Sequence, residues 1–122
     1  MKVRCVKFID EQTGQTLDSN SWLSVGKEYR VLSIYMQHGL PMKFQLIGDD
    51  GETPAYHAAN QFEIVTNIIP STWVVDFESD SYFKLTPRNW CNVGFWEDYF
   101  DGVPEAVDLF DSEKAIITKE DP

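Results

Sequence analysis

The chain has 122 residues, of which 43% are hydrophobic and 14% aromatic, so it can form one compact domain with a core and is not expected to be disordered. Ten basic against twenty acidic residues give a formal charge of −10. Because nucleic acids are bound by clustered Lys and Arg, we expect no nucleic-acid partner. A basic protein is the favoured partner, and acidity that serves solubility alone is the alternative.

The N-terminal residues 1–12 lack the apolar core of a signal peptide, and nowhere do about 18 apolar residues follow one another. We therefore expect a cytoplasmic protein without membrane contact. Cys5 and Cys91 lie far apart without metal-ligand spacing, which predicts free, buried thiols.

Strand and turn patterns fill the first two thirds of the chain. We expect a strand over 3–9 and a long strand over 27–36, where β-branched and aromatic residues are frequent. Two further runs over 43–58 flank an Asp-Gly step at Asp50 and Gly51 that suits a hairpin turn. A strand over 61–65 follows.

The order of elements over residues 22–66 resembles an SH3-like small barrel of bacterial and phage proteins. The residues that carry the likeness are SVGKEYRVL, a hairpin around GDDG, a turn at 58–59 and a closing FEIV. The resemblance implies a non-catalytic adaptor or regulatory module that binds a peptide in an aromatic-lined groove. Its groove would contain Trp22, Tyr29, Tyr35 and Tyr56.

The C-terminal part combines a hairpin with helices. Residues 72–78 and 81–87 predict two strands across a short turn. Gly94 or Asn92 is placed to open a helix over 95–100 that ends at Asp101-Gly102, and Pro104 suits the first residue of a second helix. The apolar stripe of that helix would comprise Val103, Ala106, Val107 and Phe110.

These elements predict an α+β fold: a small antiparallel sheet, or an SH3-like barrel, followed by short C-terminal helices. We expect a single domain over 1–122, with a mainly β layer over 1–85 and short helices over 86–120 packed on it.

Charge is concentrated in residues 76–113, which hold two basic and ten acidic residues. We expect Phe95, Phe100 and Phe110 to be core residues while the acids project outward. Trp and Tyr are enriched at binding hot spots, and acids steer basic partners. The candidate anchors are Trp73, Trp90, Trp96 and Tyr99, and the candidate steering and pairing groups are Asp76, Glu78, Asp80, Glu97, Asp98, Asp101, Asp108 and Asp111.

Metal and enzyme signatures are weak. Asp76, Glu78 and Asp80 alternate along a strand, but an EF-hand loop would need Gly and Glu where Ser81 and Pro87 stand. We expect neither a metal nor a cofactor.

Nucleophilic catalysis is not supported either. His38 and His57 lack ligand spacing and are expected in loops or on the surface, and nothing in the sequence activates Cys91. The chain is therefore predicted not to be an enzyme.

The segment SYFKLTPRNW, followed by GFWEDYFDGVPEA and a final short helix, resembles the acidic immunity proteins of bacterial polymorphic and contact-dependent inhibition toxins. The likeness rests on size, acidity and the Trp/Tyr/Asp/Glu mixture over 73–113. It implies a monomer that binds and neutralises a cognate toxin domain, a basic nuclease for example. A third hypothesis is an inhibitor that imitates the charge of nucleic acid.

Overall fold

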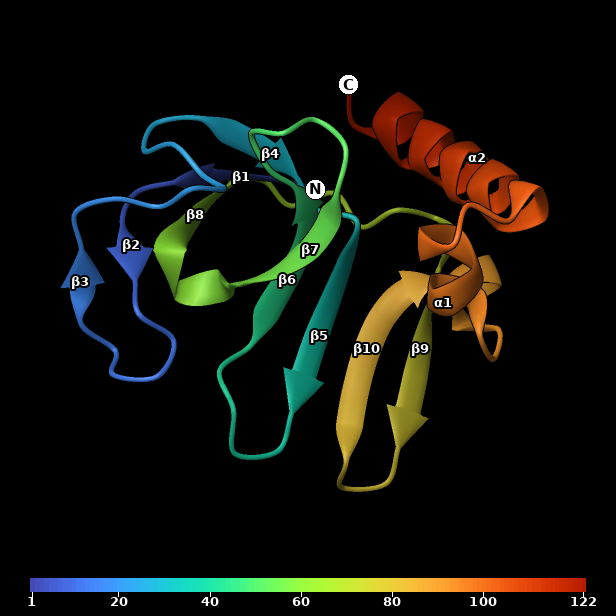
Figure 1. Cartoon of the computed structure of the whole chain (residues 1–122), viewed down its shortest axis with the longest axis horizontal. Helices are drawn as coiled ribbons and strands as arrows, with labels where there is room; N and C mark the ends of the chain where they lie inside the picture. The colour runs from blue at the N-terminus through green and yellow to red at the C-terminus, as the bar shows by residue number, and fades with distance from the viewer.

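The computed structural model describes residues 1–122 as an α+β fold of antiparallel sheets with helices at the C-terminal end (Figure 1). The strands are β1 (Lys2–Cys5), β2 (Phe8–Ile9), β3 (Thr16–Leu17), β4 (Glu28–Arg30), β5 (Ser33–Gln37), β6 (Lys43–Ile47), β7 (Pro54–Ala58), β8 (Phe62–Thr66), β9 (Trp73–Glu78) and β10 (Tyr82–Pro87). The helices are α1 (Phe95–Phe100) and α2 (Pro104–Glu120), with short 3-10 helices η1 (Ala59–Gln61) and η2 (Arg88–Cys91). The predicted fold class is confirmed.

The strands form two main sheets and a small ribbon. One sheet has the order β4-β1-β8, the other the order β7-β6-β5-β10-β9, and β2 pairs with β3. The sheets remain open, so the barrel alternative is wrong. The segment 22–66 is shared between the two main sheets instead of closing on itself.

The long strand expected over 27–36 is divided because the chain changes sheets at its middle. The amide of Val31 donates to the carbonyl of Met1 (2.9 Å), beside the three-stranded sheet, whereas the amide of Leu32 donates to the carbonyl of Gln45 (2.7 Å) in β6. The strand expected over 3–9 is also divided, since Val6 and Lys7 turn their amides to the carbonyl of Gln61.

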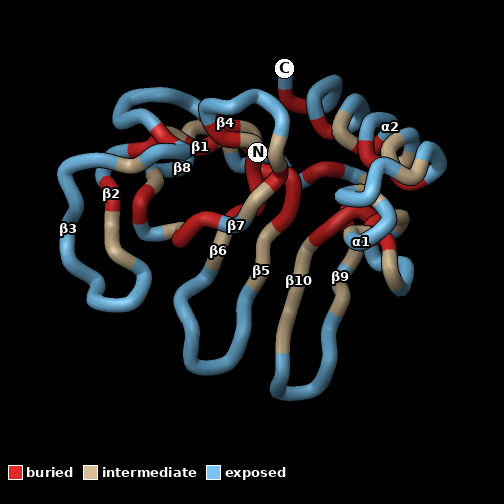
Figure 2. Tube along the Cα trace, viewed as in Figure 1, coloured by how far each residue is buried: buried red, intermediate tan, exposed pale blue.

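The two hairpins predicted from local sequence are present. β6 and β7 are joined through a turn in which Gly51 has a φ of +71°, a conformation that glycine adopts without steric cost. β9 and β10 pair over their full length across a turn in which Ser79 has a φ of +42°. Their loop and the loop between β5 and β6 are exposed (Figure 2).

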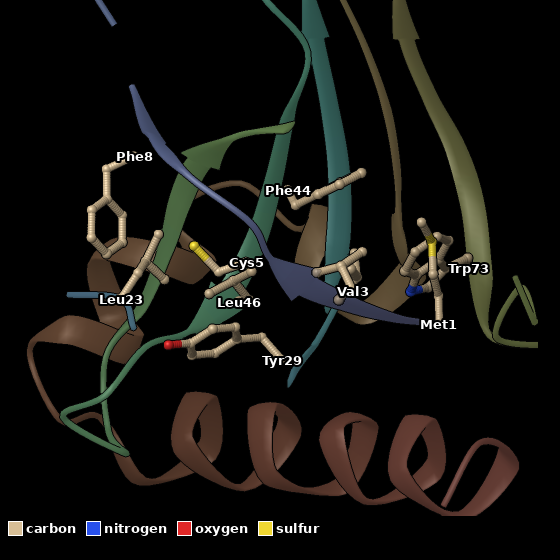
Figure 3. Close-up of a cluster of buried hydrophobic side chains, with 10 residues drawn as sticks. Met1, Val3, Cys5, Phe8, Leu23, Tyr29, Phe44, Leu46 and Trp73 are labelled. Carbon is tan, nitrogen blue, oxygen red and sulfur yellow. The ribbon is translucent and has the colours of Figure 1, made fainter. Parts of the chain in front are cut away.

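A first core fills the space between the two main sheets (Figure 3). Val3 and Cys5 of β1 and Leu46 of β6 are fully buried there. Trp73 joins them from β9, with 9% of its surface exposed. The two sheets are thus held together by side chains from strands near the start and near the end of the β region of the sequence, β1 and β9.

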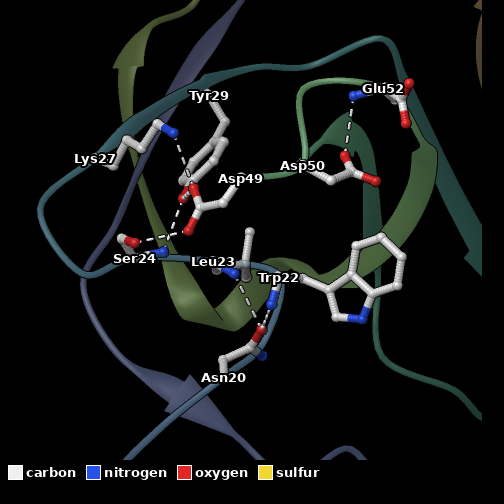
Figure 4. A network of polar contacts seen from close by, with 9 residues as sticks. All are labelled: Asn20, Trp22, Leu23, Ser24, Lys27, Tyr29, Asp49, Asp50 and Glu52. Atoms are coloured by element: carbon white, nitrogen blue, oxygen red, sulfur yellow. Dashed lines mark hydrogen bonds and ion pairs between the residues drawn. The ribbon is translucent and has the colours of Figure 1, made fainter.

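A polar network fixes the loop before β4 on this core (Figure 4). The buried Tyr29 donates its hydroxyl to Asp49 (2.7 Å). The same carboxylate accepts hydrogen bonds from the Ser24 hydroxyl (2.7 Å) and the Lys27 ammonium (2.9 Å). Next to it, a Cβ at Gly48 would come within 2.4 Å of the Trp22 carbonyl oxygen, so only glycine allows this approach.

The second core lies between the helices and the five-stranded sheet. α1 begins after Gly94, which has a φ of +77°, and α2 begins at Pro104, as the sequence predicts. The buried stripe of α2 comprises Ala106, Phe110, Glu113 and Ile117. The stripe therefore continues through Glu113 and Ile117, while Val107 is only half-buried.

One expectation for the helical layer is wrong, since Phe100, the last residue of α1, is 59% exposed and is not a core residue. α2 is the longer of the two helices, with 17 residues. The end of α2 is tied to the sheets: Glu120 accepts a hydrogen bond from the Ser71 amide (2.7 Å), and Arg30 donates to the Asp121 carbonyl (2.7 Å). Neither helix has the length and apolar content that crossing a membrane requires.

Candidate functional site

The candidate site lies on one face of the five-stranded sheet, where the cross-strand register aligns polar and aromatic side chains. Lys84 of β10 stands opposite Asp76 of β9 on one side and Tyr35 of β5 on the other. Its ammonium lies 5.4 Å from the ring centre of Tyr35 and 5.2 Å from that of Tyr82. This face therefore already holds one cation over aromatic rings.

η2 and α1 close one end of this face and form a pocket of about 220 Å³. Trp90 of η2 and Trp96 of α1 meet edge to face with ring centres 5.5 Å apart, a favourable aromatic geometry. The pocket is lined by Tyr56, Asp76, Tyr82, Lys84, Thr86, Trp90, Cys91, Asn92, Gly94, Phe95, Trp96 and Glu97. We call it the β9–α1 pocket. It combines two carboxylates with aromatic walls.

Four of the predicted site residues meet in the β9–α1 pocket: Asp76, Trp90, Trp96 and Glu97. Asp76 accepts a long hydrogen bond from the Tyr82 hydroxyl (3.4 Å). Asp98 and Asp101 continue the acidic surface on the exposed side of α1. Four of the twelve residues that line the pocket were therefore among the predicted site residues.

The other predicted residues are more scattered. Glu78 and Asp80 lie at the exposed tip of the β9–β10 hairpin, and Asp108 and Asp111 are exposed on α2. Tyr99 is half-buried with its ring centre 4.5 Å from that of Phe110. The acids therefore form a broad surface instead of one cluster.

Two of the expected anchors are core residues. Trp73 belongs to the first core, and Trp90 is 3% exposed with its ring stacked 5.1 Å from that of Phe110. Both indoles are buried because β9 and η2 turn them toward the packed layers. Neither can insert into a partner, so Trp96 and Tyr99, both half-buried, are the predicted anchors that the structure leaves partly accessible.

Sequence reasoning missed several residues of the pocket, above all Lys84 of β10, Cys91 of η2 and Asn92, which follows η2. The expected two-residue turn would place Phe83 opposite Asp76, whereas the register of the structure places Lys84 there. Cys91 was expected to be buried but is exposed. Partial desolvation and the nearby charge of Asp76 raise the pKa of its thiol, so at neutral pH it stays protonated.

The two histidines lie apart from the pocket. His57 is buried, contrary to expectation, because it faces the same side of the sheet as Phe44 in β6. Burial lowers its pKa. Tyr56 points to the opposite face and lines the β9–α1 pocket, so His57 cannot pair with Cys91. His38 is exposed, and no group of three or more His, Cys, Asp or Glu side chains is arranged to hold a metal ion.

The groove expected for a peptide-binding adaptor is not assembled. Tyr35 and Tyr56 do meet, with ring centres 5.4 Å apart. Tyr29, however, is buried and bonded to Asp49, and Trp22 lies beside His57 on the other side of β7. Two of the four aromatics therefore belong to the β9–α1 side, and two do not.

Comparison of the chain with protein-family models, with curated proteins and with solved structures gave no match. The function is therefore argued from the geometry and charge of this surface.

Proposed function

We propose that this protein is an immunity protein that binds and neutralises a basic toxin domain through the β9–α1 pocket and the acidic surface around it. The observation that carries the proposal is that none of the ten acidic residues in 76–113 forms an ion pair within the chain. All five ion pairs use acids outside this segment. Nine of these carboxylates are at least partly exposed and available to a basic partner, whereas Glu113 is buried.

The physical chemistry of such a surface suits rapid and selective protein binding. Complementary charge can raise the association rate toward about 10⁸ M⁻¹s⁻¹ at low salt, and a few central aromatic residues supply most of the affinity. Trp96 lines the same pocket as the carboxylates of Asp76 and Glu97. A Lys or Arg side chain of the partner would find the same kind of aromatic neighbours that Lys84 has within the chain.

The first test targets α1. Asp98 and Asp101 are exposed, and their side chains make no hydrogen bond or ion pair within the chain. We expect Asp98→Lys with Asp101→Lys to slow association with the basic partner at least tenfold, because the change opposes electrostatic steering. The partner would be isolated by co-expression of the tagged protein with its neighbouring genes, and association would be measured by stopped-flow fluorescence.

A control is Glu11→Lys with Asp18→Lys, which changes the net charge equally on exposed residues near the β2–β3 ribbon and also removes the ion pair between Glu11 and Lys43. If both double variants slow association to the same degree, net charge and not this surface governs encounter. If neither does, the proposed interface is wrong. Circular dichroism spectra would verify that both variants fold.

A further inference from the structure

β9 forms one edge of the five-stranded sheet, and its outer side pairs with no strand. β10 occupies only its inner side, over Trp73 to Glu78. Val75 and Phe77 are 60% and 63% exposed, so no other element covers this part of the strand on their face. An open edge of this length is a template for an added strand, because its outward backbone N–H and C=O groups lack partners.

The opposite edge of the sheet is less open. β7 begins with Pro54, which has no backbone N–H to donate. Pro54, His57 and Ala58 of this strand are buried. β9 contains no proline and has one buried residue, Trp73. Of the two edge strands, β9 is therefore the one more accessible to pairing with a further strand.

The two faces of β9 differ sharply in chemistry. Asp76 and Glu78 lie on the face of the β9–α1 pocket, whereas Val75 and Phe77 lie on the other face, opposite Leu85 and Phe83. On that apolar side a shallow pocket of about 310 Å³ includes Met36, Leu40, Met42, Phe77 and Phe83. A strand added at this edge would meet carboxylates on one face and apolar side chains on the other.

We propose that β9 accepts an extended segment of the partner as a sixth strand of the sheet, and that this segment alternates basic with apolar side chains. The inference rests on the proposed function for the identity of the partner. The basic side chains would pair with Asp76 and Glu78, and the apolar side chains would cover Val75 and Phe77. Backbone hydrogen bonds to β9 would supply affinity, and the alternation would supply selectivity.

Charge argues against a second copy of this chain as the occupant. If two copies paired antiparallel around a two-fold axis at Asp76, the Asp76 side chains of the two copies would face each other. If the axis lay at Phe77, Asp76 of each copy would face Glu78 of the other. In a pairing centred on Val75, the two Asp76 side chains become diagonal neighbours. Like charges opposite or near one another on paired strands are destabilising, so acids on this edge disfavour self-association.

The test uses an eight-residue peptide that alternates lysine with valine, with both ends capped, and a matched peptide with glutamate in place of lysine. We expect the lysine peptide to bind the full-length protein at least tenfold more tightly in fluorescence anisotropy. Hydrogen exchange followed by NMR should show slower exchange for amides within Trp73–Glu78. Asp76→Lys with Glu78→Lys should reverse the preference between the two peptides.

Two controls separate strand addition from general attraction to a protein of charge −10. A backbone N-methylated lysine peptide keeps its charge but cannot donate backbone hydrogen bonds, so it should lose binding at least tenfold. The Glu11→Lys and Asp18→Lys double variant should still prefer the lysine peptide. The inference would be overturned if the methylated peptide bound as tightly as the unmethylated one, or if exchange slowed only at amides that lie outside β9.

The outcomes also separate this inference from the proposed function. If a basic partner is captured and depends on Asp98 and Asp101, but the lysine peptide leaves β9 unaffected, the strand addition is wrong and the proposed function stands. If the peptide protects β9 but co-expression yields no basic partner, the edge binds basic strands and the immunity function is wrong.

Discussion

Asp49 is the residue with the densest set of polar contacts in the chain, and its position explains an unusual titration. Hydrogen bonds from Ser24, Lys27 and Tyr29 lower the pKa of its carboxyl group from 3.8 to about 2. In the same network, burial raises the pKa of Tyr29 to about 12. The folded state thus favours a charged Asp49 and a neutral Tyr29.

The stabilisation by Asp49 should depend on pH in a defined window. A carboxyl whose pKa is lower in the folded state stabilises the fold above its unfolded pKa of 3.8 and loses this effect as pH falls toward about 2. At pH 7, we expect Asp49→Ala to lower the free energy of unfolding by about 2 kcal/mol, since hydrogen bonds to a charged group are lost. Urea titrations of both proteins should show this difference shrinking from pH 5 to pH 2. A constant difference would show that the charge of Asp49 is unimportant.

At the scale of elements, α2 is held by a cluster of aromatic rings around Phe110. This residue is 1% exposed, with ring centres of Trp90 and Tyr99 at 5.1 and 4.5 Å. Phe100, the last residue of α1, offers the contrast because it is 59% exposed. The two phenylalanines look alike in the sequence but differ in the area they remove from water.

We expect Phe110→Ala to lower the free energy of unfolding by about 4 kcal/mol, because it leaves a cavity in the second core. Phe100→Ala should change it by less than about 0.5 kcal/mol, as an exposed substitution does. Guanidinium unfolding followed by circular dichroism measures both. A large loss for Phe100→Ala would mean that α1 is packed more tightly than its exposure indicates.

Local signals predicted the hairpins and helix starts, but not the partners of each strand. The β9–β10 hairpin and the start of α2 at Pro104 follow from nearby residues, as turn and capping preferences are local. The break between Val31 and Leu32 does not, since both halves have the same β-forming composition. It arises from hydrogen bonds to Met1 and Gln45, which lie far away in sequence.

The candidate site was predictable to the extent that it depends on charge. Most acids of this chain are exposed, and Glu97 and Asp98 were placed correctly on the surface. Burial of Trp73 and Trp90 was not predictable, because indole suits both cores and interfaces. Only the packing of β9 and η2 against other layers decides between these roles.

At the scale of the molecule, charge opposes folding while it favours the proposed binding. Five of the twenty acidic residues form ion pairs, which leaves most carboxylates without a basic neighbour. Such an excess of one sign destabilises the compact state through self-repulsion. Salt screens these repulsions, since the Debye length falls from about 30 Å at 0.01 M to about 3 Å at 1 M.

Salt should therefore have opposite effects on stability and on association. Raising NaCl from about 0.01 M to about 1 M should increase the melting temperature by about 4 °C, which corresponds to about 1 kcal/mol of relieved repulsion. Over the same range, association with a basic partner should slow at least tenfold, because the attraction that steers it is screened. Differential scanning calorimetry and stopped-flow fluorescence at matched salt concentrations measure the two effects. A melting temperature that falls with salt would contradict this prediction, because it would mean that the attraction within ion pairs outweighs the repulsion between unpaired carboxylates such as those of Asp98 and Asp101.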